Sequence, residues 1–72
     1  MVTSALEQSQ AAVALGHSPI PVLRRLTIEE TGEAIIIRGR VPSYYDKQLA
    51  QETLMPYLQG RSLQNQIIVV RP

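Results

Sequence analysis

The sequence predicts a small α+β domain, an αββαβ two-layer sandwich in which a three-stranded mixed sheet carries two helices on one face. Three observations predict it. Apolar residues recur with helical spacing in residues 4–15 and 43–60, and they alternate with polar residues, as in strands, across residues 23–41 and 66–71. A turn signal separates the first two strands, and a capping pattern opens each helix. A chain of 72 residues makes one domain, which buries only about 60% of the surface that its unfolded form exposes.

The N-terminal part, residues 1–22, is expected to be a helix followed by a proline linker. Residues 4–7 (Ser-Ala-Leu-Glu) fit a capping box, and Gly16 can supply a left-handed C-cap. This helix should be the loosest element, because its apolar stripe is thin and comprises only Ala5, Leu6, Ala12 and Val13. Pro19 and Pro21 then favour an extended linker.

A ββαβ core is expected over residues 23–72, and it begins with a hairpin. The turn signal is Glu-Thr-Gly-Glu at residues 30–33. A two-residue loop at Thr31 and Gly32 makes the numbers of paired residues add up to 63. This register sets two apolar pairs on one face, Ile28 with Ile35 and Leu26 with Ile37. It also sets Arg25 opposite Arg38, which is unfavourable unless Glu29 or solvent relieves the repulsion.

The second helix begins with another capping box, formed by Ser43 and Asp46. Its apolar face comprises Leu49, Ala50, Thr53, Leu54 and Tyr57. Pro56 removes one backbone hydrogen bond, so we expect a kink or an early end, and Gly60 closes the segment. The last strand, residues 66–71, follows a helical crossover and should therefore lie parallel to the second strand.

Several short motifs in this core resemble those of the BON domain, a family named for bacterial OsmY and nodulation proteins. The motifs are Gly39-Arg40-Val41-Pro42-Ser43, then Lys47 and Ala50, then Leu58-Gln59-Gly60, then Leu63-Gln64-Asn65-Gln66-Ile67-Ile68-Val69. The resemblance covers residues 23–70 and implies the same αββαβ fold. It also implies a non-catalytic role in contacts with phospholipid, at membranes or between protein subunits. Arg61 departs from the pattern, because the family usually has an apolar residue there, and Pro56 is foreign to the family's second helix.

No residue pattern predicts an enzyme, a metal site or a cofactor site. The chain has no cysteine and a single histidine, His17, and one imidazole cannot build a zinc site alone. Capping explains Ser43, and Glu29, Glu30 and Glu33 are expected to be solvated charges beside a turn. No glycine-rich phosphate loop occurs in the sequence. We therefore expect no catalytic, cofactor-binding or metal-binding residues.

The open face of the sheet is the predicted contact surface. Strand parity turns three arginines and three branched aliphatic residues away from the helices: Arg25, Ile36, Arg38, Arg40, Ile68 and Val70. Solvated sheet faces are usually polar, and apolar patches on small domains tend to mark interaction sites. The alternative explanation is β-propensity, because strands use Ile and Val even where they are exposed.

Two kinds of partner fit this surface: an anionic phospholipid or envelope surface, which arginine can bind through phosphate, and a second copy of the chain. RNA ranks third, because none of the three tyrosines lies on a predicted strand. The net charge of +1 does not by itself indicate nucleic-acid binding. No apolar run approaches the roughly 18–20 residues of a membrane span, and no export signal is evident. The cytoplasm is therefore the default location, with periplasmic or envelope association left open.

Overall fold

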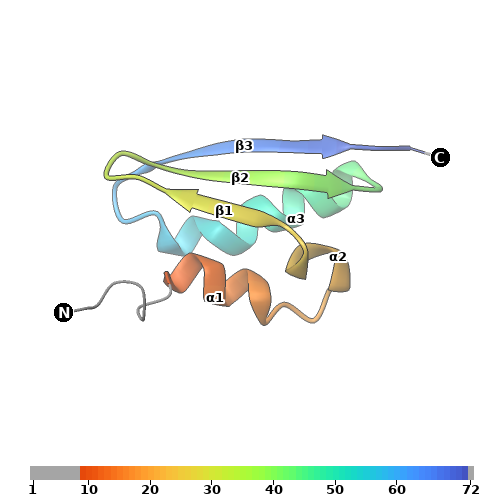
Figure 1. The fold of residues 1–72 in the computed structure, drawn as a ribbon, viewed down its shortest axis with the longest axis horizontal. Coiled ribbons are helices and arrows are strands. Elements are labelled where there is room, and N and C mark those ends of the chain that lie inside the picture. The colour runs from red at the N-terminus through yellow and green to blue at the C-terminus, as the bar shows by residue number, and fades with distance from the viewer. Residues whose placement is uncertain (1–8, 72) are drawn as a thin grey trace.

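The computed structural model describes residues 9–71 and confirms the α+β class. The elements are α1 (Gln10–Gly16), α2 (Pro21–Arg24), β1 (Thr27–Glu30), β2 (Ala34–Val41), α3 (Tyr44–Leu54), the 3-10 turn η2 (Met55–Tyr57) and β3 (Ser62–Val69). The strands form one sheet in the order β1-β2-β3. β1 is antiparallel to β2, and β3 is parallel to β2. Figure 1 shows the sheet as one layer and α1 and α3 together as the other.

The hydrophobic core fills the space between the sheet and the helices. Its central residues come from β2, whose Ile35 and Ile37 are completely buried. The other residues of this core are Ala11, Leu15, Leu23, Leu26, Val41, Ala50, Leu54 and Ile67. Ala34 is also buried, but it lies outside this cluster and shares the strand alternation of Ile36. Every described element except the turn η2 and the strand β1 contributes to this set, so the core joins both layers.

The hairpin forms, but its predicted register is wrong by two residues. Ile28 pairs with Ile37, and Glu30 pairs with Ile35. The loop therefore consists of Gly32 and Glu33. The reason is Thr31, whose hydroxyl accepts hydrogen bonds from the N–H groups of Glu33 (3.1 Å) and Ala34 (2.9 Å). This side-chain turn places the two-residue loop at Gly32 and Glu33, one residue later than the predicted loop at Thr31 and Gly32. The parity is unchanged, so the same apolar residues still face the helices.

The first helix is shorter than predicted. It begins at Gln10, because Ser9 is extended (φ −64°, ψ 145°) and its hydroxyl accepts a hydrogen bond from the N–H of Ala12. The helix therefore does not run unbroken from residue 4, and the capping box of residues 4–7 lies outside the described residues. Gly16 does not adopt a left-handed conformation, and His17 is the C-cap with a φ of −100°. The buried stripe is Ala11 and Leu15 and not the predicted Ala12 and Val13, of which Ala12 is exposed and Val13 is half-buried.

The predicted extended linker contains a second short helix, α2. Pro21 occupies its first turn, where the missing N–H costs nothing and the fixed φ suits a helix. Leu23 of this helix is completely buried, which the extended-linker prediction did not allow for. The side chain of Arg24 ties the preceding loop down by donating to the carbonyl oxygen of Ser18 at 2.8 Å. The first strand consequently starts at Thr27, four residues after the predicted position.

The helix predicted after Ser43 is α3, and its N-cap agrees with prediction, whereas the last strand starts earlier than predicted. Ser43 caps α3 by accepting a hydrogen bond from the N–H of Asp46 (3.2 Å). The helix ends at Leu54, and Pro56 lies in the tighter turn η2, so the predicted early end is confirmed. Gly60 closes the segment with a φ of +83°. β3 already begins at Ser62, because backbone pairing with β2 also holds the polar residues 64–66.

Candidate contact surface

The sheet face away from the helices carries ten strand residues. Ala34, at the start of β2, is buried, and the other nine are named next. On β1 and β2 they are Thr27, Glu29, Ile36, Arg38 and Arg40, and on β3 they are Ser62, Gln64, Gln66 and Ile68. Val70 continues the same alternation beyond β3, where its N–H donates to the carbonyl oxygen of Val41 at 2.8 Å. All of these residues except Ala34 and Ile36 are exposed. Five of the six predicted contact residues therefore lie on or just beyond this face.

Arg25 is the exception, and its predicted place on the sheet is wrong. It is the C-cap of α2, with helical dihedral angles (φ −94°, ψ −4°), and it precedes the first strand. The residue opposite Arg38 is therefore Thr27, not Arg25. The predicted repulsion between two arginines does not arise.

Arg38 is the centre of a polar network that crosses all three strands. Its guanidinium donates to Glu29 Oε1 on β1 at 2.7 Å and to Gln66 Oε1 on β3 at 3.2 Å. Gln66 in turn donates to Gln64 Oε1 at 3.5 Å. The ion pair with Glu29 is about half exposed, so it contributes little to stability. Its consequence is electrostatic, since Glu29 neutralises the charge that Arg38 would offer to an anionic partner.

The same network divides the aliphatic residues of the open face. Ile36 lies opposite Gln64, whereas Ile68 lies opposite Arg40. The two isoleucines are therefore four residues apart along the strands, which corresponds to roughly 13 Å. The row of Arg38 and Gln66 lies between them. Ile36 is half-buried beside this polar row and does not form one patch with Ile68.

Another group of exposed residues lies near the ends of β2 and β3 and in the first turn of α3. We call this group the carboxyl-end patch, and it comprises Arg40, Tyr44, Tyr45, Ile68, Val70 and Arg71. The exposed fractions are 63% for Tyr44, 72% for Tyr45, 59% for Ile68 and 47% for Val70. The guanidinium of Arg71 lies over the ring of Tyr44, 5.6 Å from its centre. This contact joins the end of β3 to the first turn of α3.

Tyr44, Tyr45 and Arg71 were not predicted as contact residues. A signal for them exists in the topology. In a β-helix-β crossover between parallel strands, the helix begins where the first strand ends, and the second strand ends at the same edge of the sheet. The segments just after β2 and just after β3 therefore lie at the same end of the molecule, as Figure 1 shows where the chain leaves β3. Face parity alone does not reveal this arrangement.

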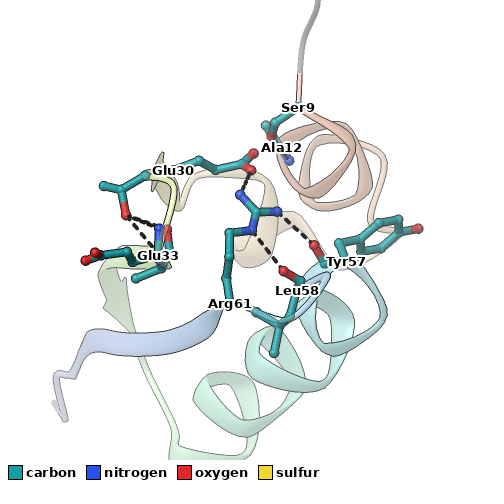
Figure 2. A network of polar contacts seen from close by, with 9 residues as sticks. Ser9, Ala12, Glu30, Glu33, Tyr57, Leu58 and Arg61 are labelled. Atoms are coloured by element: carbon teal, nitrogen blue, oxygen red, sulfur yellow. Dashed lines mark hydrogen bonds and ion pairs between the residues drawn. The ribbon is translucent and has the colours of Figure 1, made fainter.

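A partly buried ion pair at the opposite end of the sheet links several elements of the fold (Figure 2). Arg61 donates to Glu30 Oε1 at 2.6 Å, to the carbonyl oxygen of Leu58 at 2.8 Å and to that of Tyr57 at 3.1 Å. The side chains of Arg61 and Glu30 are only 19% and 23% exposed. Arg61 thus links β1, the end of η2 and the start of β3. This structural role explains an arginine where the resemblance led us to expect an apolar residue.

The carboxyl group of Glu30 is shifted toward its charged form. The hydroxyl of Ser9, beside the carboxyl in Figure 2, has the largest influence and lowers the pKa. Burial raises the pKa, and the guanidinium of Arg61 lowers it again by hydrogen bonding and by its charge. The net pKa lies below the ordinary value of 4.5. Arg61 binds Oε1, whereas Oε2 is buried and has no hydrogen-bond partner among the described residues. Because the carboxylate is held in the ion pair with Arg61, we interpret it as structural and not as a general base.

The described residues also line hollows away from the open face of the sheet. An open hollow of about 510 Å³ lies between α1 and η2 and is lined by Gln10, Val13, Ala14, His17 and Tyr57. His17 is exposed, as predicted for a loop histidine. Within residues 9–71, no group of three His, Asp or Glu side chains could hold a metal ion. The absence of enzymatic activity stays a prediction.

Comparison with family models, with curated proteins and with solved structures found no match for this chain. In the part of the chain that the structure describes, no helix has the length and apolar character needed to cross a bilayer. The resemblance to BON domains therefore stays a prediction, and the functional hypothesis depends on the geometry of the carboxyl-end patch.

Proposed function

We propose that this chain is a non-catalytic, BON-like binding module that docks its carboxyl-end patch on an anionic phospholipid surface. One observation carries the proposal. Five large apolar side chains are strongly exposed in residues 9–71, and four of them belong to this patch: Tyr44, Tyr45, Ile68 and Val70. Two arginines, Arg40 and Arg71, accompany them. Exposed apolar residues that lie at one end of a small domain tend to mark an interaction site.

The chemistry of the patch suits the boundary between lipid headgroups and acyl chains. Ile68 and Val70 can enter the apolar region, and each contributes about 1.5–3 kcal/mol if it becomes fully buried. Tyrosine favours the headgroup level, because its ring is apolar and its hydroxyl is polar. Each arginine near an anionic surface adds about 1 kcal/mol, and this contribution weakens as salt increases. Aliphatic residues should therefore provide affinity, and arginines should provide the preference for anionic lipid.

Co-sedimentation with vesicles tests the proposal with matched variants. The vesicles contain phosphatidylcholine with or without phosphatidylglycerol. The double variant Ile68→Ser/Val70→Ser should lose binding, whereas Met55→Ser, which removes a side chain that is 53% exposed elsewhere, should bind like the parent. Arg40→Gln should reduce binding only to vesicles with phosphatidylglycerol, and Arg25→Gln should have no effect. Equal binding by all folded variants, or none by the parent, would contradict the proposal.

RNA is the weaker candidate in this geometry. RNA-binding sheets stack bases on aromatic side chains of their strands. In residues 9–71, the tyrosines lie on α3 and η2, and the strands carry no aromatic residue. A second copy of the chain remains the alternative partner. The surface that favours this partner is the outer edge of β3 and not the carboxyl-end patch.

A further inference from the structure

The outer edge of β3 presents backbone groups that the sheet does not use. β3 is a terminal strand of the described sheet. Its first residue, Ser62, donates its N–H to the carbonyl oxygen of Glu33 (3.0 Å), and Val70 beyond its end donates to Val41 (2.8 Å). Backbone groups of alternate residues point to the same side of a parallel strand, so the even-numbered residues from 62 to 70 face β2. Residues 63, 65, 67 and 69 therefore turn their N–H and C=O groups outward.

The two edges of this sheet differ in how they are protected. β1 has only four residues, two of them are Glu29 and Glu30, and α1 contacts this strand. β3 has eight residues, and the segment 62–70 contains no charged residue, no proline and no glycine. Short length, charge and proline are the usual means by which proteins prevent a sheet edge from pairing with another strand. β3 uses none of these three.

One side chain does cover the outer edge of β3, and it is Asn65. Its Oδ1 accepts a hydrogen bond from the N–H of Ile67 at 3.1 Å, which is one of the outward-pointing donors. Its Nδ2 donates to Gln51 Oε1 at 3.2 Å and to the carbonyl oxygen of Lys47 at 3.5 Å, both on α3. The carboxamide is thus fixed from the helix side and occupies the middle of the edge. Any incoming strand must displace it.

We propose that the outer edge of β3 pairs antiparallel with β3 of a second copy, and that the Asn65 side chain hinders this pairing until it is displaced. A register centred on Gln66 sets Asn65 opposite Ile67 and Leu63 opposite Val69, and it joins two sheets into one of six strands. The N–H of Ile67 then exchanges its bond to Asn65 Oδ1 for a bond to the backbone carbonyl of residue 65 in the second copy. A second copy fits because the paired segments 62–70 carry no charge, so no like charges meet within them. Arg61 and Arg71 of the two copies lie opposite each other only beyond the ends of these segments.

The oligomeric state of matched variants tests this proposal, measured by sedimentation velocity from micromolar to near-millimolar concentration. Asn65→Ala should lower the dimer dissociation constant at least tenfold, because it frees the N–H of Ile67. Gln51→Ala should act in the same direction more weakly, because it releases Asn65 without altering β3. Gln64→Lys, which charges the edge strand, should weaken association, whereas Gln48→Lys on exposed α3 carries the same charge change and should not.

The proposal fails if folded Asn65→Ala and Gln51→Ala keep the mass of the parent at every concentration. If Asn65→Ala does not fold, Gln51→Ala decides alone. It also fails if Gln48→Lys weakens association as much as Gln64→Lys, since net charge and not the edge would then be responsible. Asn65, Gln51 and Gln64 lie outside the carboxyl-end patch, so vesicle binding and self-association can fail independently of each other.

Discussion

At the scale of single residues, two glutamates next to each other in sequence have opposite roles. Glu29 lies on the open face, where its side chain is 55% exposed and pairs with Arg38. Glu30 points to the other side of β1, where its side chain is 23% exposed and pairs with Arg61. Strand alternation alone produces this difference. Exposed pairs contribute about 0–1 kcal/mol, whereas removal of one partner from a partly buried, hydrogen-bonded pair costs more.

We expect Glu30→Gln to lower the free energy of unfolding by about 1–3 kcal/mol at neutral pH, because Arg61 loses its charged partner. Glu29→Gln, the matched control, should cost less than about 1 kcal/mol. The pKa of Glu30 is lowered in the folded state, so its contribution is complete above the unfolded pKa and is lost as pH falls through the lower folded pKa. Urea denaturation from neutral to acidic pH should show the gap between Glu30→Gln and the parent closing below about pH 4.5. A gap that stays constant would contradict the assignment.

At the scale of one strand, β2 separates the two faces of the sheet. Ile35 and Ile37 are completely buried, while Ile36 is half-buried among polar neighbours. Ile35→Ala and Ile37→Ala should each cost about 2–5 kcal/mol, enough to unfold much of so small a domain. Ile36→Thr should be tolerated, with a loss below about 1 kcal/mol. Thermal and urea unfolding would check this, and equal damage at all three positions in a monomer would mean that both faces are covered.

Gly39 is the point at which β2 approaches the chain before β1 most closely. Its φ is +144°, and a Cβ there would lie 2.5 Å from Leu26 Cδ2 and 3.5 Å from Leu26 Cα. Gly39→Ala should therefore cost about 2–4 kcal/mol, from backbone strain together with displacement of the Leu26 side chain. Gly32→Ala is the control, because nothing lies within 4 Å of its Cβ position, and its effect should stay within about 0.5 kcal/mol. Similar unfolding midpoints for the two variants would refute this reason for the glycine.

The elements that sequence patterns predicted well are those with a local cause. Ser43 caps α3 and Pro56 ends it, because each acts on its own backbone. The hairpin register was wrong because Thr31 forms a side-chain turn that apolar parity cannot detect, since a shift by two residues preserves parity. α2 was missed because Pro21 suits both a linker and a first helical turn.

At the scale of the whole molecule, face parity predicted which way side chains point but not what surrounds them. It correctly turned Ile36, Arg38, Arg40, Ile68 and Val70 toward the open face. It could not show that Glu29 neutralises Arg38, because that contact depends on the true register across two strands. It could not find Tyr44 and its neighbours either, because only the parallel crossover brings the start of α3 to the end of β3.

The strand β2 and the helix α1 should differ in local stability. β2 is the central strand and carries the fully buried Ile35 and Ile37, whereas α1 has seven residues and buries only Ala11 and Leu15. Elements with little buried apolar area open locally, below the free energy of global unfolding. α1 should therefore be the loosest described element, consistent with its thin apolar stripe.

Native-state hydrogen exchange should reveal this difference. We expect the amides of Val13 and His17, which bond to Ser9 and Val13 at 3.0 Å, to exchange through a local opening that depends little on urea. Amides of Ile35 and Ile37 should follow global unfolding. Ser9→Ala removes the hydroxyl that caps α1, so it should reduce protection in α1 by about 1 kcal/mol and reduce that of β2 less. Identical opening free energies and urea slopes for both groups would show that α1 unfolds only with the sheet.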